Sequence, residues 1–284
     1  MQKIIISADS TCDLGPELKE RYHIHYFPFH IALGEEEFID SVDIFPEDIY
    51  AAYEKRGILP KTSAINVKEY YEYFKPWVDD GYEVIHINLG SAISSTHQNC
   101  RLAAEALRGV YVVDSQNLST GMGLLVLEAA IRAEQGMPAR QIAQEVEALV
   151  PKSHASFILN TLEFLKAGGR CSALVALGAN MLNLKPCIEV DNLHGGAMKV
   201  GKKYKGKLDR VLKKYVQEQL SRYPSYRRDR VFITHSGIAP ERIALVERIV
   251  REQNLFDEIH ITQASCTISS HCGPNTLGVL FLTE

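Results

Sequence analysis

Hydroxyl side chains are concentrated in one short stretch of this chain, Gly-Ser-Ala-Ile-Ser-Ser-Thr at residues 90–96. The stretch lies between an apolar run that ends at Leu89 and a run with helical spacing that begins near His97. That order is typical of a strand, a loop and the start of a helix. Such a loop aims free backbone N–H groups and hydroxyls at one point, which suits an anion. We therefore expect an anion-binding turn at residues 90–96.

Similar polar turns follow four other predicted strands. They begin at Asp9, Asp114, Thr234 and Thr262, each directly after a short apolar run. Strands that alternate with helices predict crossover connections and a mainly parallel sheet, whose ligands lie beyond the carboxyl ends of the strands. The hydroxyl-bearing turns all fall at those ends, so we expect the binding site there.

Length and composition set the class of protein. The chain has 284 residues, of which 46% are hydrophobic and 23% are charged, and this is enough for two globular cores. The net charge of −4 lacks the basic excess that nucleic-acid binding usually needs, so we expect no nucleic-acid partner.

The N-terminal residues enter a short strand at once, without an apolar leader segment. The most apolar helix, around residues 121–131, contains Glu128 and is shorter than the ~20 residues of a membrane span. We expect a cytoplasmic protein without stable membrane insertion, whose contact with membranes would be transient. Its six cysteines lie far apart and form no C-x-x-C pair, which favours reduced thiols over disulfides or zinc ligands.

The predicted elements divide the chain into two parts. We expect a hairpin over residues 26–40, outside the alternating pattern, that forms an arm over the sheet. Further helices are predicted at residues 46–55, 67–79, 97–107, 121–134 and 139–149. Pro151 and Lys152 then mark a boundary between an N-terminal α/β domain, residues 1–152, and a C-terminal domain, residues 153–284.

The second part reads as a mixed α+β domain. Its predicted strands cover residues 155–159, 186–190 and 197–200, and its predicted helices cover 162–167, 174–182 and 208–222. Two strand-and-helix or strand-and-turn units complete it. The fold class expected is therefore α/β, with a mainly parallel sheet flanked by helices in the first domain and a mixed sheet in the second.

Six segments of the chain together resemble the DegV family of bacterial fatty-acid-binding proteins. They occur in the order and spacing of that family over essentially the whole chain, and the combination is far more specific than any one piece. The segments are residues 9–14 (DSTCDL), 61–63 (KTS), 91–98, 161–170 (TLEFLKAGGR), 184–186 (LKP) and 271–278 (HCGPNTLG).

This resemblance implies a two-domain protein that holds one fatty acid between its domains. In the best-understood branch of the family, the protein presents the acid to the catalytic subunit of a fatty acid kinase, which converts the carboxyl group to an acyl phosphate for phospholipid synthesis. The protein itself would be a carrier without catalytic activity or a cofactor. A chain of ~16 methylenes gains on the order of 12 kcal/mol on burial before ordering costs, so the tail supplies affinity.

The resemblance also implies the site residues. Thr62 and Ser94 would hydrogen-bond the carboxylate, and His271 would lie at the pocket mouth. Arg170 and Lys202 would serve the head group or the docking of the kinase. The supporting loops would include Ser63, Ser95, Thr96 and Gly273.

Each of these residues also has a simpler interpretation. Ser94 and Thr96 stand where such residues usually cap a helix, and a lysine run such as the one around Lys202 is usually a solvated face.

The chain departs from the family pattern at two places. The family usually continues Thr-Ser with Gln-Pro, where this chain has Ala64 and Ile65. The family also usually carries an arginine where Tyr204 stands, so the sequence does not define which surface would bind the kinase.

Two other functions are conceivable for the same residues. A hydrolase would use Ser94 as nucleophile, His271 as base and Asp9 or Asp114 as orienter, but the chain has no G-x-S-x-G elbow. A binder of phosphorylated metabolites lacks both glycine-rich phosphate fingerprints. No metal-binding histidine pair of the H-E-x-x-H type occurs either. The sequence therefore favours lipid carriage.

Overall fold

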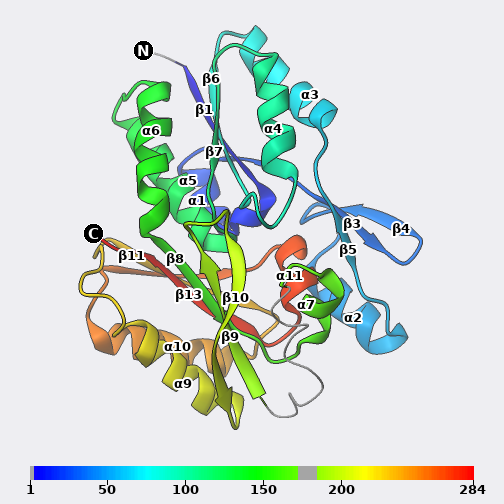
Figure 1. Ribbon diagram of the computed structural model, residues 1–284, viewed down its shortest axis with the longest axis vertical. Helices are drawn as coiled ribbons and strands as arrows, with labels where there is room; N and C mark the ends of the chain where they lie inside the picture. Colours follow the sequence, from blue (N-terminus) through cyan, green and yellow to red (C-terminus); the bar gives the residue numbers. More distant parts are fainter. Residues whose placement is uncertain (1–2, 172–183) are drawn as a thin grey trace.

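The computed structural model describes residues 3–171 and 184–284, and within them the chain forms three β-sheets (Figure 1). The first sheet consists of four parallel strands in the order β2-β1-β6-β7. Their bounds are β1 (Ile4–Asp9), β2 (His25–Phe27), β6 (Glu83–Asn88) and β7 (Val110–Asp114). The parallel sheet predicted for the N-terminal part is confirmed.

Helices cover both faces of this first sheet. On one face lie α5 (Ser119–Glu134) and α6 (Ala139–Leu149), and on the other lie α3 (Val67–Asp79) and α4 (Thr96–Glu105) (Figure 1). A short helix, α1 (Pro16–Arg21), and a 3₁₀ turn at Ser10–Cys12 connect β1 to β2. Parallel strands require such crossovers, because each strand must return to the same edge before the next begins.

The second sheet has six strands in the order β10-β9-β8-β13-β11-β12, of which only β11 and β12 are parallel. The strands are β8 (Ser153–Ile158), β9 (Leu184–Asp191), β10 (Ala197–Lys205), β11 (Arg230–Ser236), β12 (Glu258–Gln263) and β13 (Thr276–Leu282). The helices among the described residues of this part are α7 (Glu163–Gly168), α9 (Leu208–Gln219), α10 (Pro240–Gln253) and α11 (Cys266–Cys272). The mixed sheet predicted for this part is confirmed.

Helix α5 lies between the two sheets. Its first twelve residues, 119–130, are all buried, and it contacts β1 and β6 of the first sheet as well as β8, β11 and β13 of the second. A helix that is apolar on every side must be covered on every side, and two sheets provide that cover. Helix α5 is the apolar run that the sequence analysis described as too short to span a membrane. It thus forms the centre of the molecule.

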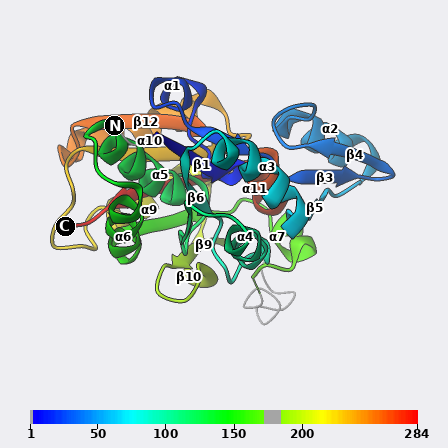
Figure 2. The same cartoon turned by 90° about the horizontal axis from the view of Figure 1, so that it is seen from above.

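The third sheet is a separate arm of three antiparallel strands in the order β4-β3-β5. The strands are β3 (His30–Leu33), β4 (Glu36–Ile39) and β5 (Lys61–Ser63), and helix α2 (Pro46–Arg56) packs beside them. Seen from above, the arm projects from the side of the molecule that carries α3 and α11 (Figure 2). Its strand β5 runs past α11, to which it supplies contacts.

The hairpin predicted for residues 26–40 is only partly correct. Strands β3 and β4 do form a hairpin around Gly34, whose φ of 73° suits a tight turn. Tyr26 and Phe27, however, belong to β2 and pair with β1 in the first sheet. Pro28 separates the two strands, since proline has no N–H to donate to a continuous ladder.

Most other predicted elements match the structure within a few residues. Helices α3 and α6 have the predicted bounds, whereas α9 ends at Gln219 rather than at residue 222. Helix α1 and strand β5 are additional to the predicted elements, because each spans six residues or fewer and leaves little periodic pattern. The helix predicted for residues 174–182 lies outside the described residues. We retain 152/153 as a proposed domain boundary, because β8 begins at Ser153.

The sequence also led to expectations about disulfides and about membrane-spanning helices. All six cysteines are buried within the described residues, where no disulfide joins them. Among the helices in residues 3–171 and 184–284, none has the length and apolar character that crossing a bilayer requires.

Candidate functional site

A cavity lies where the first sheet, the arm and helices α7 and α11 meet. Its volume is about 520 Å³, counting space that opens to solvent. Most of its wall is apolar, formed by Phe29, Leu89, Ile93, Leu118, Leu165, Met198, Ile268 and Cys272. The polar side chains on its wall are those of Thr62, Ser63, Ser94, Arg170, Thr267 and His271.

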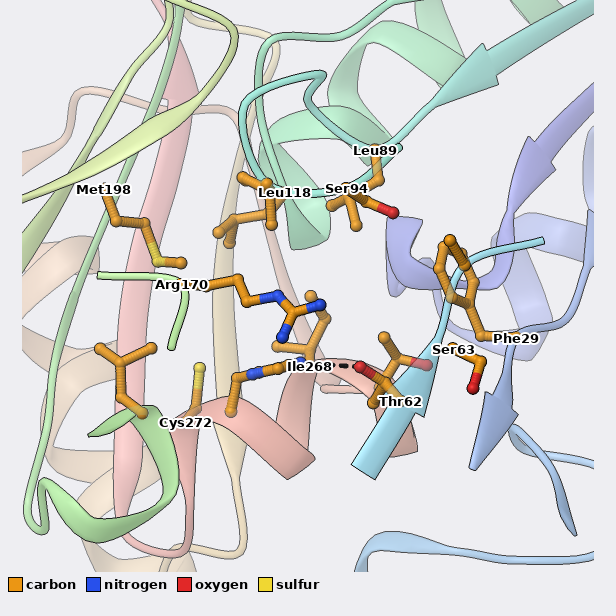
Figure 3. A pocket seen from close by; sticks show the side chains of 15 residues that line it. Phe29, Thr62, Ser63, Leu89, Ser94, Leu118, Arg170, Met198, Ile268 and Cys272 are labelled. Carbon is orange, nitrogen blue, oxygen red and sulfur yellow. Dashed lines mark hydrogen bonds between the residues drawn. The ribbon is translucent and has the colours of Figure 1, made fainter. Parts of the chain in front are cut away.

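The close-up in Figure 3 shows how the polar groups are distributed in this cavity. Thr62 lies on one side, on strand β5 of the arm, and Ser94 lies across from it, in the loop after β6. The guanidinium group of Arg170 extends into the space between them. Arg170 is the one Lys or Arg among the described lining residues. Two hydroxyls and a cation therefore face one apolar space.

Thr62 is joined to His271 on α11. The Oγ1 atom of Thr62 lies 3.0 Å from Nε2 of His271 (Figure 3), although 209 positions separate the two residues in the chain. Strand β5 places Thr62 because it pairs with β3, with Thr62 opposite Ile31. The arm and helix α11 thus share one hydrogen bond at the cavity wall.

His271 is neutral in this setting. Burial, and to a smaller extent the nearby positive charge of Arg170, lower the pKa of its imidazole to about 4. Its Nδ1 is buried without a hydrogen-bond partner among the described residues. We assign the hydrogen to Nε2, because an orphaned N–H is rarer in proteins than an orphaned acceptor. Nε2–H then donates to Thr62, whose own hydroxyl hydrogen remains available to a ligand.

Gly168 at the end of α7 makes room for this imidazole. A Cβ atom at position 168 would lie 2.1 Å from Nδ1 of His271, a distance that no real contact allows. Gly168 therefore has a packing role that its sequence position did not reveal, whereas a Cβ at Gly169 would meet no neighbouring atom. Gly273, after α11, is also required, since its φ is 69° and a Cβ there would lie 2.7 Å from Phe164.

Ser94 combines the ligand-binding and capping roles considered from the sequence. Its side chain lines the cavity, and its Oγ also accepts a hydrogen bond from the backbone N–H of Thr96, at 3.2 Å. The same Oγ lies 2.5 Å from Oγ1 of Thr96, which is fully buried at the start of α4. Thr96 thus holds the Ser94 hydroxyl in place. Ser95 is exposed and makes no side-chain capping bond.

The backbone of the turn differs from the prediction. The N–H groups of Ile93 and Ser94 both bond to the carbonyl of Gly90, at 2.9 and 3.3 Å. The N–H of Ala92 bonds to the carbonyl of Gly195, and that of Ser91 bonds to Asp114. The expectation of free backbone N–H groups aimed at an anion was therefore wrong for residues 91–94. Their side chains, rather than their backbone, remain to meet a ligand.

The remaining predicted residues lie around the site or away from it. Ser63 lines the cavity and is exposed, next to Thr62 on β5. Arg170 is exposed, and its guanidinium donates to the carbonyl of Gly168 at 2.6 Å. Lys202 on β10 is not among the lining residues, and it pairs instead with Glu218 on α9 at 2.7 Å. Tyr204 also bonds to Glu218, so that part of β10 has its own network.

The residues of the hydrolase alternative do not come together as a triad. His271 contacts Thr62 rather than Ser94, and its Nδ1 lacks an orienting partner among the described residues. Asp114 accepts from the N–H groups of Ser91 and Gln116. Nucleophilic catalysis needs the base next to the hydroxyl and a third group that orients the base.

Asp9 instead belongs to a separate buried network that the sequence did not reveal. His86 Nε2 lies 3.1 Å from Asp9, and its Nδ1 lies 2.9 Å from Ser7 Oγ. All three side chains are fully buried, so a substrate has no access to them. Tyr70 and the N–H of Leu89 also donate to Asp9, at 2.5 and 2.8 Å. This network fixes the end of β6, from which the loop carrying Ser94 leaves.

No group of three or more potential metal ligands occurs within residues 3–171 and 184–284. The cavity offers the hydroxyls of Thr62 and Ser94 and the guanidinium of Arg170 as hydrogen-bond donors, whereas the single N–H of His271 is already given to Thr62. Such a set suits the oxygens of an anion rather than a cation.

Comparisons with known proteins identify similar sequences and similar folds. A family model described as the DegV family of uncharacterised proteins matches residues 3–284. DegV domain-containing proteins of Clostridium perfringens and Clostridium acetobutylicum are 30% and 27% identical to the chain, and each match covers 100% of both chains. A solved structure of a DegV family protein from Thermus thermophilus, described as binding fatty acid, has 26% identity and a TM-score of 0.90 over 100% of both chains. DegV of Bacillus subtilis, described as a fatty acid binding protein, has 23% identity and a TM-score of 0.83 over 100% of both chains, which shows likeness of fold.

Proposed function

This chain belongs to the DegV family, and we propose that it binds one long-chain fatty acid in the cavity between the arm, the first sheet and α11. The observation that carries this proposal is the position of the Thr62 and Ser94 hydroxyls on opposite sides of an apolar cavity, with the guanidinium of Arg170 between them. An ionised carboxylate next to apolar walls is costly unless it is hydrogen-bonded or paired with a cation. These three groups supply both kinds of partner.

The remaining wall suits an acyl chain. Leu89, Leu118 and Ile268 come from three different parts of the chain and line the same cavity. Each methylene that leaves water gains about 0.8 kcal/mol, so the tail provides most of the affinity and the head group provides orientation. A fatty acid fits both halves of the cavity, whereas an inorganic phosphate fits only the polar half.

We further propose that the bound carboxyl group is presented to a fatty acid kinase for conversion to an acyl phosphate. Arg170 and Ser63 line the cavity and are exposed, so the head group would lie near the surface, within reach of a partner. The chain would then act as a cytoplasmic carrier in phospholipid synthesis, and the phosphoryl transfer would belong to the kinase.

The head-group assignment can be tested by binding measurements on two variants. Thr62→Val removes a hydroxyl with little change of shape, and Ser94→Ala removes the hydroxyl on the other side. A hydrogen bond to a charged group contributes about 1.5–3 kcal/mol. We therefore expect each variant to bind palmitic acid about 10- to 100-fold more weakly, with an unchanged circular dichroism spectrum.

Two further measurements complete the test. Organic extraction and mass spectrometry of the purified protein should release a long-chain acid. Lys202→Gln, which changes a charge away from the cavity, serves as the control and should retain the affinity of the native chain. Acyl phosphate formation by a partner kinase should require the loaded protein, and a kinase that ignores it would exclude the carrier role.

A further inference from the structure

A second cavity adjoins the first on the side of the six-stranded sheet. Its volume is about 320 Å³, again counting open space, and Leu118, Ile268 and Cys272 line both cavities. These three residues therefore form the boundary that the two cavities share, which we call the waist. We call the second cavity the distal chamber, because it lies beyond the waist as seen from Thr62 and Arg170.

One wall of the distal chamber includes a glycine of β13, Gly278. Residues 276, 278 and 280 share one face of this strand, and Gly278 lies between Thr276 and Leu280 on that face. Its cross-strand neighbours are Phe157 on β8 and Thr234 on β11. A Cβ atom at position 278 would lie 2.7 Å from the carbonyl oxygen of Ser156, so the position requires glycine. Gly278 therefore contributes only backbone atoms to the chamber wall.

The hydroxyl groups around this chamber are bonded to other protein groups. Thr234 Oγ1 lies 2.6 Å from Thr120 Oγ1 and 3.0 Å from Thr262 Oγ1. Ser236 donates to Ser269, and Thr276 donates to the carbonyl of Cys272.

Ser119, at the start of α5, likewise donates to Asp13, at 2.6 Å. A chamber with many serines and threonines in its wall thus presents mainly carbon to its interior, because each of these oxygens already has a partner. Apart from Nδ1 of the lining residue His235, which is buried without a hydrogen-bond partner among the described residues, the chamber is suited to an apolar group.

We propose that the distal chamber receives the methyl end of the bound acid, and that Ala264 and Leu280 in its wall determine the longest acyl chain the protein accepts. This inference rests on the proposed function, since it concerns the tail of the same ligand. Ala264 packs in one cluster with Leu118, Phe157 and Ile268, and Leu280 lies beside Gly278 on β13. Short acids fill only the first cavity, and longer acids pass the waist.

The test compares acids of two lengths on variants that fill the distal chamber. Ala264→Leu adds bulk from one wall, and Leu280→Phe adds bulk from another. Excluding two terminal methylenes corresponds to a loss of affinity on the order of tenfold. We expect both variants to bind palmitic acid at least about tenfold more weakly, while decanoic acid binds within about twofold of the native value. Ala148→Leu, the same change at an exposed position of α6, should alter neither affinity.

Each outcome separates this inference from the proposed function. If the native chain binds neither acid, the proposed function fails. If it binds both acids and the filled variants lose neither or lose both equally, the length determinant is wrong. A crystal with palmitic acid brominated at its methyl end gives a readout that needs no variant, because the anomalous bromine peak should lie between Gly278 and Ala264. A peak at the solvent side of the first cavity would overturn the proposal, as would tighter binding of palmitic acid hydroxylated at that end.

Discussion

At the scale of single residues, the candidate head-group site depends on a side chain that need not touch the ligand. With the imidazole hydrogen assigned to Nε2, His271 donates to Thr62 across 3.0 Å, and the Thr62 hydroxyl hydrogen is then free to bond a ligand. Gly168 in turn leaves the space in which the imidazole lies. This chain of contacts predicts that a small change at Gly168 acts on the ligand through two intervening residues.

We expect Gly168→Ala to weaken binding of palmitic acid by about five- to thirtyfold, the effect of losing about 1–2 kcal/mol at one hydrogen bond. The backbone of residue 168 is compatible with alanine, because it ends α7 with an ordinary negative φ. The effect therefore comes from displacement of His271. Binding should be measured in a double-mutant cycle with His271→Ala.

In the His271→Ala background, the Gly168→Ala change should have no further effect on affinity, because the ring that it displaces is already absent. Additive losses in the double variant would mean that Gly168 acts on the site by another route. Arg170 is the nearest alternative, since its guanidinium is bonded to the carbonyl of residue 168.

The sequence located the side chains at this scale better than it located the backbone groups. Thr62, Ser94, Arg170 and His271, which the family resemblance singled out, all line one cavity, and their contact with a carboxylate stays a prediction. The anion-binding N–H groups expected at residues 91–94 are absent from the site, because neighbouring carbonyls and Asp114 accept them. A sequence shows which residues carry donors, but it does not show which donors the folded chain has already paired.

At the scale of elements, one carboxylate joins the start of α5 to the start of α11. Asp13 has a left-handed backbone with φ of 52°, and its side chain accepts from Ser119 Oγ at 2.6 Å and from the N–H of Ser265 at 2.9 Å. Burial raises the pKa of this carboxyl group to about 7, against the partial effect of the two hydrogen bonds. Helix α11 carries His271, so Asp13 helps to position the site.

The raised pKa of Asp13 gives a dependence of stability on pH whose sign can be worked out. The unfolded chain releases this proton near the ordinary aspartate pKa of 3.8, whereas the folded chain keeps it to about 7. The stability contributed by the proton is therefore full below about pH 4 and is lost as the pH rises through about 7. The total is about 4 kcal/mol at 1.36 kcal/mol per pKa unit.

Asp13→Asn should lack this part of the pH dependence. Urea unfolding of both proteins at pH 4.5, 6 and 8 isolates it, because the other titrating groups are common to both. The free energy of unfolding of the variant relative to the native protein should rise by a few kcal/mol between the lowest and the highest pH. A difference that stays constant with pH would show that Asp13 is ionised throughout.

Elements were predictable where their pattern was long. Helix α5 was visible as an apolar run, and its place between two sheets explains why it has no polar face. Helix α11 and strand β5 were harder to predict, with seven and three residues. Both carry site residues, so the site depends on elements that local patterns specify least. The family resemblance supplied what periodicity did not.

At the scale of the whole molecule, the cavity wall is drawn from all three sheets or their loops. Leu89 follows β6 of the first sheet, Met198 lies on β10 of the second, and Thr62 lies on β5 of the arm. The sequence predicted two parts with a site between them, and the arm was expected only as a cover over the sheet. That the arm supplies part of the site follows from the pairing of β5 with β3, which brings residues 61–63 back to the strand formed by residues 30–33.

A ligand that touches all three sheets should stabilise them together. Any opening that separates the arm, the first sheet or α11 exposes the bound acid, so palmitic acid should bind only to the closed fold and raise the midpoint of thermal unfolding. At a free concentration 100-fold above its Kd, the gain is about 2.7 kcal/mol, which corresponds to a shift on the order of 5 °C for a chain of this size. Differential scanning calorimetry of delipidated protein with and without the acid measures this shift.

The methyl ester of palmitic acid, which has the same tail and no charge, serves as the control for the head group. It should produce a clearly smaller shift, and Thr62→Val should reduce the difference between the two ligands. Equal shifts from acid and ester would mean that Thr62, Ser94 and Arg170 do not bind the carboxylate.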